Sequence, residues 1–296
     1  MIGELERIAG QCVGVRCDMA MLQTRDVFCN RVWGGAFDPP DAEFWPAALA
    51  KVKSAHPDFL VLGEVYWHLE YQLQQFGFDY TYDKRLYDRL VEGDAGAVRT
   101  HLRADFAYQR HLARFIENHD EPRALAVFGL RHSRAVATLA LTLPGLRLVH
   151  EGQLEGRQLK LPVQLGRAAA EPPEPGLEPF YRRLIELLSD PVFREGAWWL
   201  IEPKAAWTGN PSYVNFVAHA WTLGDEIRLV VVNLASHQAQ CLLPLDFPHL
   251  ASMSWDLLDL FREVQYVCLG DELVSHGLYV DLPAFGYHLF RLQPRP

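Results

Sequence analysis

Apolar residues follow two alternating patterns over the first two thirds of the chain. Helical spacing predicts helices over residues 2–12, 41–55, 84–91, 95–102, 122–142 (in two pieces) and 178–188. Short apolar runs predict strands over residues 13–20, 59–65, 76–82, 111–118 and 145–150. The run FLVLGEV at 59–65 is nearly continuous, which is typical of a strand buried on both faces. Strands that alternate with helices predict an α/β fold with a parallel sheet and right-handed crossovers.

The pattern changes near residue 197, where strand-like runs replace the helical ones. These runs cover 213–223, 227–234, 240–245, 264–269 and 286–292. We therefore predict two domains, an α/β domain over 1–195 and an all-β sandwich over 196–296. The stretch 166–179 is rich in Pro and Glu, and we expect it to be a surface excursion of the first domain.

Composition and charge exclude several classes of protein. The 296 residues are 49% hydrophobic and 22% charged, which is an ordinary globular composition with ample material for a core. The net charge is −9 and Lys and Arg do not cluster, which argues against nucleic acid and anionic membranes as partners. No apolar run reaches the roughly 20 residues that a membrane span requires.

The cysteines indicate a reduced, cytoplasmic protein. Their number is odd and no Cys-x-x-Cys pair occurs among Cys12, Cys17, Cys29, Cys241 and Cys268. This pattern favours free thiols over a disulfide framework, and no cluster has the spacing of metal ligands. The first residues, MIGELERIAG, contain acidic side chains and do not resemble a signal peptide.

Functional groups of parallel α/β sheets lie at the carboxyl ends of the strands. In GVRCDM (14–19), strand alternation places Gly14, Arg16 and Asp18 on one face. Arg16 can pair with Asp18 and keep it ionised. A purely structural ion pair explains these residues equally well.

The second predicted strand also ends in a carboxylate. Glu64 ends the apolar run at 59–65, and apolar surroundings favour a protonated carboxyl, which suits a general acid. Tyr66 and Trp67 follow at once. Such aromatics are more often part of the core, but beside a carboxylate at a strand end they also suit stacking on a sugar ring.

The third strand end is the segment ARFIENHD (113–120). Alternation places Asn118 and Asp120 on one face, with His119 next to them. Asp120 followed by Glu121 and Pro122 is also a good helix start, so Asp120 can equally be a helix cap.

Together these segments resemble a known family. GVRCDMA (14–20), GEVYW (63–67) and ENHDEPR (117–123) resemble, in this order, the later signature motifs of the α-amylase family, glycoside hydrolase family 13. PGLRLVHEGQLEG (144–156) resembles the eighth-strand segment of that family, and the all-β tail resembles its C-terminal domain. The resemblance covers nearly the whole chain. It implies a (β/α)8 TIM-type barrel and retaining chemistry on α-linked glucooligosaccharides or polysaccharides.

The resemblance also implies a role for each residue. Asp18 is expected to be the nucleophile, and Glu64 the acid that protonates the leaving oxygen and later acts as base. Asp120 is expected to bind sugar hydroxyls and favour the distorted, oxocarbenium-like state. Arg16 would orient Asp18, and His119 would bind substrate hydroxyls.

Further residues are candidates for substrate contacts. Tyr66, Trp67 and Trp33 are expected to stack on glucosyl faces. Gln153 and Glu155 are weaker candidates for the rim of the site, and simple solvation of a loop accounts for them equally well.

The resemblance accounts for only about five of the eight barrel strands. They match the fourth to the eighth strand, so we predict an incomplete barrel followed by the all-β sandwich. The third-strand motif and the domain inserted after it have no counterpart in the sequence. In the family this region supplies a substrate-binding His and, in many members, calcium ligands, so no metal or cofactor is assigned.

Three interpretations follow from the incomplete barrel. A five-stranded arc exposes two sheet edges and an apolar interior, which is an aggregation hazard. The sequence is then the C-terminal part of a larger enzyme, or one half of a split enzyme whose N-terminal barrel half is a separate chain. The third interpretation is a non-catalytic or degenerate relative that binds glucan.

Overall fold

The computed structural model describes residues 1–167 and 169–295, which form two compact units. Unit 1 comprises Met1–Lys84, Asp105–Arg114 and Gly145–Arg147. Unit 2 comprises Arg85–Ala104, Phe115–Pro144 and the described part of Leu148–Pro296. The limits of these compact units do not correspond to the predicted domain limits at residues 195 and 196, which therefore stay a prediction.

The centre of unit 1 is a five-stranded parallel sheet whose strands follow the order of the chain. The strands are β1 (Gly14–Cys17), β2 (Leu60–Gly63), β3 (Tyr80–Tyr82), β4 (Leu112–Arg114) and β5 (Leu146–Arg147). All five strands predicted from the apolar runs are therefore confirmed, although each is shorter than predicted. Their parallel order agrees with the prediction from alternating elements.

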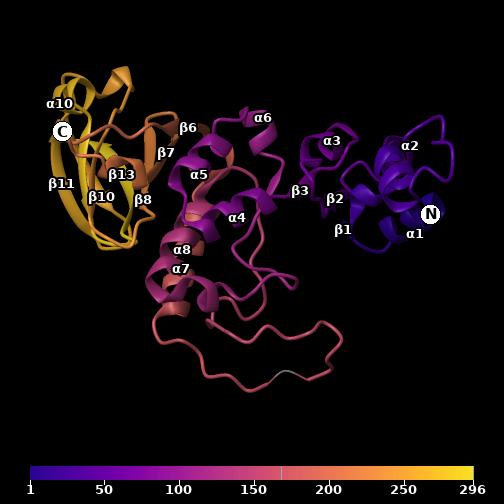
Figure 1. Cartoon of the computed structure of the whole chain (residues 1–296). Coiled ribbons are helices and arrows are strands. Elements are labelled where there is room, and N and C mark those ends of the chain that lie inside the picture. Colours follow the sequence, from indigo (N-terminus) through magenta and orange to yellow (C-terminus); the bar gives the residue numbers. More distant parts are fainter. Residues whose placement is uncertain (168, 296) are drawn as a thin grey trace. The chain divides into compact units, whose positions relative to one another are not determined.

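Helices of unit 1 lie before and between its strands in the sequence. They are α1 (Ile2–Ala9), α2 (Phe44–Ala55), α3 (Glu70–Gln75) and α6 (Phe106–Gln109), and Figure 1 shows α1 and α2 beside β1 and β2. Trp45 of α2 packs with Val61, Leu73 and Phe78 in one apolar cluster. Its indole N–H donates to the carbonyl oxygen of Ala20 at 2.8 Å, so the buried ring has a polar partner.

The two faces of β2 differ in burial. Val61 and Gly63 are buried, and a Cβ on Gly63 would lie 2.9 Å from the Phe78 ring. Leu60, on the opposite face, is 49% exposed, and Leu62 is half-buried. The prediction that this strand is buried on both faces is therefore wrong for Leu60. The cause is geometric, because the inner face of a barrel strand is covered only when the barrel closes.

Unit 2 begins with helices. They are α4 (Lys84–Glu92, from its second residue), α5 (Ala95–Leu102), α7 (Ala124–Thr142), α8 (Leu177–Leu188) and α9 (Val192–Glu195). The chain is not helical at Gly129 in α7 (φ 67°, ψ 171°), which confirms the prediction of two helical pieces. Asp94 caps α5 by accepting a hydrogen bond from the backbone N–H of Ala97 at 2.9 Å.

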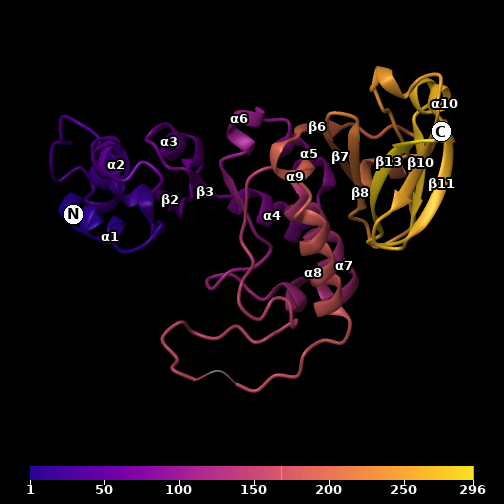
Figure 2. The same cartoon turned by 180° about the vertical axis from the view of Figure 1, so that it is seen from behind.

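The rest of unit 2 is a β-sandwich, visible from both sides in Figures 1 and 2. Its larger sheet is antiparallel with the order β11-β10-β13-β8-β7-β6, and its smaller sheet pairs β12 with β9. The two sheets enclose an apolar core that contains Phe216, Leu243, Trp255 and Val280. The strands are β6 (Ala197–Ile201), β7 (Phe216–Leu223), β8 (Glu226–Asn233), β9 (Ala239–Leu243), β10 (Ser254–Asp259), β11 (Val264–Leu269), β12 (Leu278–Leu282) and β13 (Tyr287–Pro294).

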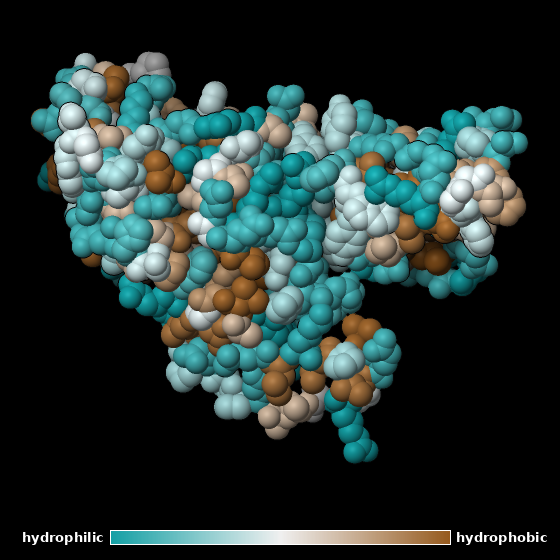
Figure 3. All heavy atoms as spheres, in the orientation of Figure 1, coloured by the Kyte–Doolittle hydropathy of each residue, from teal (hydrophilic) through white to brown (hydrophobic). Residues whose placement is uncertain are grey.

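A long loop joins β5 to α8. The predicted surface excursion at 166–179 lies partly in this loop and partly in α8, and residue 168 is outside the described residues. Leu159, Val163 and Leu165 of the loop are exposed, and Figure 3 shows apolar side chains on it among hydrophilic ones. The prediction of a surface segment is confirmed for its described residues up to Gly176. Among the helices of the described residues, none is both long and apolar enough to cross a bilayer.

Candidate active site

Unit 1 brings Arg16, Asp18 and Glu64 together. In the register of β1 and β2, Cys17 lies opposite Gly63, so Asp18 and Glu64 leave neighbouring parallel strands at the same end. The Arg16 guanidinium joins the two carboxylates. Its Nη1 donates to Asp18 Oδ1, and its Nη2 lies 3.0 Å from Glu64 Oε2. The two predicted carboxylates thus share one cation.

The Glu64 carboxylate is buried, with only 3% of its side chain exposed, and two further groups donate to it. The backbone N–H of Met19 donates to Oε2 at 2.7 Å, and the Tyr66 hydroxyl donates to Oε1 at 2.9 Å. A buried carboxylate requires such partners, because desolvation without them is costly. The apolar run that predicted Glu64 gave no sign of these donors.

The backbone around Glu64 is held as firmly as its side chain. Its N–H donates to the carbonyl oxygen of Cys17 at 3.0 Å, and its own carbonyl accepts from Ala20 at 2.9 Å. These bonds extend the pairing of β1 and β2 beyond the strand ends. Met19 lies between them in the left-handed region (φ 44°), which aims its N–H at the Glu64 carboxylate.

Asp18 has the opposite environment, since 77% of its side chain is exposed. One carboxylate of the pair is therefore fixed in the interior, and the other faces solvent while still touching the same guanidinium. Two carboxyl groups in such different surroundings are suited to two different chemical roles.

Several interactions keep Arg16 charged. Burial by itself lowers the pKa of Arg16, but hydrogen bonds to Tyr82 and Asp18 outweigh it, so the pKa is raised. The guanidinium carbon also lies 5.6 Å from the centre of the Tyr82 ring. Tyr82 of β3 was not singled out from the sequence, and its only signal there is its place near the end of a weak strand.

The predicted stacking residues differ in their surroundings. Tyr66 is half-buried against the core of unit 1, with its hydroxyl bound to Glu64, so it orients the carboxylate. Trp67 is 45% exposed, has a positive φ of 61°, and carries the Arg31 guanidinium over its ring at 4.9 Å. Of the two, Trp67 is the more exposed.

Trp33 belongs to an exposed aromatic group. It follows a π-helix (Val27–Val32) where the sequence predicted only a loop. Its ring centre lies 6.2 Å from that of Phe28 and 5.9 Å from that of Phe37, both edge-on, and all three side chains are exposed. Such a group presents an apolar surface of the kind on which sugar rings stack.

The third motif lies in unit 2, where His119 and Asp120 form a pair. His119 Nε2 is 2.9 Å from Asp120 Oδ2, and both side chains are partly exposed. Asn118 accepts hydrogen bonds from the backbone N–H groups of Asp120 (2.8 Å) and Glu121 (2.9 Å). The helix-cap alternative for Asp120 is therefore wrong, because Asn118 fixes this turn and α7 begins only at Ala124.

Glu117 anchors this segment, a role that the sequence did not reveal. It is buried and accepts from Arg123 Nη1 (2.7 Å) and from the backbone N–H of Ala124 (2.7 Å). Its Oε1 also lies 3.1 Å from His150 Nδ1. Glu117 thus joins the motif to the start of α7, where a negative charge is favourable.

Gln153 is buried in unit 2, not exposed on a rim. Its side-chain oxygen accepts from the backbone N–H of His150 at 3.1 Å, and its side-chain amide N–H donates to the Tyr181 hydroxyl at 3.0 Å. Burial, as the main cause, raises the pKa of Tyr181 to about 12, so this hydroxyl keeps its proton. Glu155 is half-buried, and its carbonyl accepts from the Glu174 N–H at 2.7 Å.

A second buried ion pair supports the sheet of unit 1. Arg114, at the end of β4, is fully buried and donates to the Asp83 carboxylate, which follows β3. Its Nη2 donates to both the side-chain and the main-chain oxygen of Gln109. Burial lowers the pKa of Arg114, against the opposing effect of Asp83. Among the described residues, no group of three or more His, Cys, Asp or Glu side chains is arranged to hold a metal ion.

Comparison with known proteins gives several relatives. No protein-family model matches the chain. It is 23% identical over 266 residues to a cyclomaltodextrinase of Geobacillus thermopakistaniensis, covering 86% of this chain and 43% of the relative. It is 28% identical over 243 residues to the α-amylase MalA of Haloarcula japonica, covering 78% of this chain and 33% of the relative. The chain thus spans less than half the length of either relative.

Solved structures share the fold. A Geobacillus thermoleovorans α-amylase complexed with acarbose superposes with a TM-score of 0.72 at 17% identity, over 100% of this chain and 63% of that one. A maltogenic α-amylase AmyB of Thermotoga neapolitana gives 0.67 at 21% identity, over 99% and 63%. These similarities confirm the predicted fold class, an incomplete (β/α)8 TIM-type barrel of five strands followed by a β domain.

Proposed function

We propose that this chain, which is related to the α-amylase family of glycoside hydrolases, takes part in retaining cleavage or transfer at α-glucosidic bonds. The observation that carries the proposal is the shared guanidinium of Arg16, which joins a buried Glu64 to an exposed Asp18. Retaining glycosidases need two carboxyl groups only about 5–5.5 Å apart. A single cation in contact with both carboxylates supports such a short separation.

The proposed first step forms a covalent intermediate. An Asp18 oxygen attacks the anomeric carbon and forms a new bond to it, while the bond from that carbon to the leaving oxygen breaks. Glu64 gives its proton to the leaving oxygen. In the second step Glu64 takes a proton from water or from an acceptor hydroxyl, which then displaces Asp18 from the anomeric carbon.

The neighbouring groups are assigned to orientation and binding. Tyr66 and the N–H of Met19 hold Glu64 in place, so that its proton is delivered in one direction. Arg16 orients Asp18 and balances its charge. His119 and Asp120, which already form a pair in unit 2, are proposed to bind substrate hydroxyls, and the exposed Trp67 is proposed to stack on a sugar ring.

The proposed substrates are α-linked glucooligosaccharides or polysaccharides. The relatives include a cyclomaltodextrinase and α-amylases, and the solved structures include one with acarbose and a hydrolase bound to cyclic α-maltosyl-(1→6)-maltose. We further propose that activity belongs to a closed barrel of eight strands. Five of these are described here, and the remaining three come from further sequence or from a second chain.

A second candidate function is glucan binding without catalysis. The specific observation in its favour is the exposed aromatic group of Phe28, Trp33 and Phe37, which offers sugar-stacking surface without any carboxylate chemistry. This candidate predicts that Trp33→Ala weakens binding to glucan, while Asp18→Asn changes nothing that can be measured.

Turnover measurements and trapping of the covalent intermediate distinguish the two candidate functions. The protein, expressed from the longest open reading frame that contains this sequence, is incubated with maltoheptaose, and products are followed by chromatography. We expect Asp18→Asn and Glu64→Gln each to lower turnover by at least about 10²-fold, and Asp41→Asn, at an exposed position, to leave it unchanged. A 5-fluoroglucosyl fluoride is expected to label the peptide that contains Asp18. Full turnover in Asp18→Asn, or labelling of another carboxylate, would refute the catalytic proposal.

A further inference from the structure

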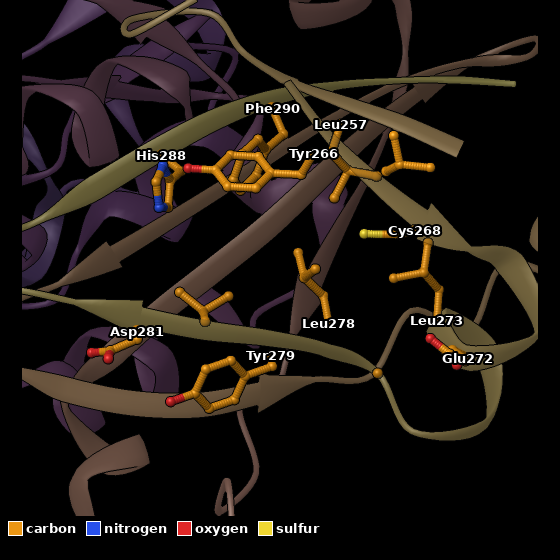
Figure 4. A pocket seen from close by; sticks show the side chains of 13 residues that line it. Leu257, Tyr266, Cys268, Glu272, Leu273, Leu278, Tyr279, Asp281, His288 and Phe290 are labelled. Atoms are coloured by element: carbon orange, nitrogen blue, oxygen red, sulfur yellow. The ribbon is translucent and has the colours of Figure 1, made fainter. Parts of the chain in front are cut away.

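The β-sandwich of unit 2 contains a cavity that the catalytic proposal does not use (Figure 4). It lies between strands β10, β11 and β13 of the larger sheet and strand β12 of the smaller one, and helix α10 (Gly270–Ser275) contributes to its lining. Its volume is about 500 Å³, within the roughly 300–1,000 Å³ of small-molecule sites. Since β11 and β12 are both edge strands, the cavity lies at an edge of the sandwich.

The inner faces of the two sheets line this cavity. Tyr266 of β11 lies opposite Leu257 of β10, and Leu257 is 1% exposed, so both side chains face the interior of the sandwich. In β12, Leu278 and Val280 face the same interior and pack in its apolar core. Tyr279 alternates with them, is 52% exposed and lies on the outer face (Figure 4). The body of the cavity is therefore apolar.

Three rings of the larger sheet follow one another along the cavity. Phe290 of β13 is buried, and its ring centre lies 5.9 Å from that of Tyr266, edge-on, and 4.6 Å from that of His288, stacked. His288 precedes Phe290 by two residues in β13, so it faces the same interior and lines the cavity. Its side chain is only 13% exposed. The apolar surface thus ends at an imidazole.

The imidazole of His288 has one nitrogen available to a ligand. Its Nδ1 lies 2.6 Å from Asp259 Oδ2, and because an ionised carboxylate can only accept, Nδ1 carries the proton. Asp259 is fully buried and also accepts from Arg262 Nη1 at 2.7 Å, so the charge of that guanidinium is balanced. Among the described residues, no hydrogen bond involves His288 Nε2. In the neutral imidazole this second nitrogen is an acceptor.

The charges around the cavity favour a neutral ligand. Glu272 and Asp281 are the acidic residues of the lining, and no Lys or Arg occurs among the described residues that form it. Carboxylates and phosphates are therefore disfavoured. The apolar interior requires an apolar body, and the acceptor nitrogen of His288 requires one hydroxyl donor. A phenol offers both, because its ring packs well against an aromatic ring such as Phe290.

We propose that this cavity binds a small neutral phenol, whose ring packs against Phe290 and whose hydroxyl donates to Nε2 of His288. The site is independent of the catalytic proposal, because Asp18 and Glu64 lie in unit 1 and every lining residue lies in unit 2. Failure of either proposal therefore leaves the other standing.

Three probes with one alkyl group test the chemistry of the ligand. Binding of 4-propylphenol, 4-propylanisole and 4-propylbenzoate is measured by titration calorimetry at about pH 8.5, where a phenol with an ordinary pKa of about 10 keeps its proton. The phenol is expected to bind at least about fivefold more tightly than the anisole, which lacks the donor, because one hydrogen bond is lost. The anionic benzoate is expected to bind at least about tenfold more weakly than the phenol. Equal affinity for phenol and anisole, or tighter binding of the benzoate, overturns the proposal.

Variants decide whether His288 and the cavity form the site. His288→Phe keeps a ring beside Phe290 but removes the acceptor, so the ratio of the phenol and anisole affinities is expected to fall to about one. Leu278→Trp fills the cavity and is expected to weaken binding of 4-propylphenol at least about tenfold. Ile185→Trp, at an exposed position of α8, is the matched control and should bind like the wild type. An unchanged ratio in His288→Phe, or full binding in Leu278→Trp, overturns the proposal.

Cys268 reports where the ligand binds, because it lines the cavity and is half-buried. Desolvation, and secondarily the charge of Glu272, raises the pKa of this thiol, so its iodoacetamide labelling is also followed at about pH 8.5. The exposed Cys12 of unit 1 is the internal reference. Saturating 4-propylphenol is expected to slow the labelling of Cys268 at least about fivefold and to leave Cys12 unchanged. Equal labelling of Cys268 with and without the phenol overturns the proposal.

Discussion

Replacing Arg16 with Met is expected to remove the charge that links the Asp18 and Glu64 carboxylates, and so to destabilise the fold. Methionine keeps much of the apolar stem but removes the charge that contacts Glu64 at 3.0 Å and also Asp18. Breaking a buried ion pair by removing one partner costs about 3–5 kcal/mol. Arg16 is 24% exposed, and Glu64 keeps the Met19 and Tyr66 donors, so the expected loss of unfolding free energy is about 2 kcal/mol.

A double-mutant cycle isolates the contribution of Glu64. Urea unfolding at pH 7 is measured for the wild type, Arg16→Met, Glu64→Gln and the double variant. Because the two groups are in direct contact, we expect a coupling energy of about 1–2 kcal/mol. The parallel cycle with Asp18→Asn is the control, since that side chain is 77% exposed and its coupling should stay below about 0.5 kcal/mol. Equal coupling in both cycles, or none with Glu64, would refute the reasoning.

Three further predictions concern the stability of the fold. Arg114→Met alone is expected to cost about 3–5 kcal/mol of unfolding free energy, because it leaves the buried Asp83 carboxylate without its partner charge. The double variant Arg114→Met/Asp83→Leu is expected to regain part of this loss in urea unfolding, and a larger loss in the double variant contradicts the prediction. Gly145→Ala is expected to lower the unfolding free energy by about 2–4 kcal/mol, because φ is 119° and a Cβ would collide with a backbone oxygen of β4. The control Gly166→Ala, where a Cβ would meet open space, should change the unfolding free energy by no more than about 0.5 kcal/mol. Burial alone would raise the pKa of Asp259, but hydrogen bonds with His288 and Arg262 outweigh it and lower the pKa. The stabilisation is therefore present above the unfolded pKa of about 3.9 and is lost as the pH falls through the folded pKa. Asp259→Asn should accordingly cost about 2 kcal/mol of unfolding free energy at pH 7 and almost nothing at pH 2. An equal cost at both pH values contradicts this prediction.

Elements with a sustained apolar pattern could be predicted from the sequence. The five parallel strands and the strands β7, β8, β9, β11 and β13 follow apolar runs, and each was predicted. Short helices such as α3 and α6 were missed, because helices of four to six residues are stabilised by tertiary packing and not by their own sequence. In β10 (SWDLLD), the acidic residues disguise the alternation. Asp259 is nevertheless buried, because Arg262 and His288 contact its carboxylate in the folded chain.

The candidate site was predictable in its carboxylates but not in what holds them. Asp18 and Glu64 were found because each lies at the end of a predicted strand, and a strand end is a fixed place in a parallel sheet. The Met19 N–H that binds Glu64 has no sequence signal, since every residue except proline carries the same donor. Glu117 was overlooked for a related reason, because its importance comes from burial and not from its residue type.

The two carboxylates also differ in freedom of movement, and this difference supports their proposed roles independently of the motifs. Glu64 is held by three donors and by backbone bonds on both sides, so it can act only on an atom that is brought to it. That is sufficient for a group that delivers and removes a proton along one direction. Asp18 is exposed, and among the described residues its side chain is bound through Arg16, so in the proposed reaction it would be free to follow the anomeric carbon as the covalent bond forms and breaks. In the proposed reaction, the guanidinium shared by both would keep the exposed carboxylate within reach of the buried one.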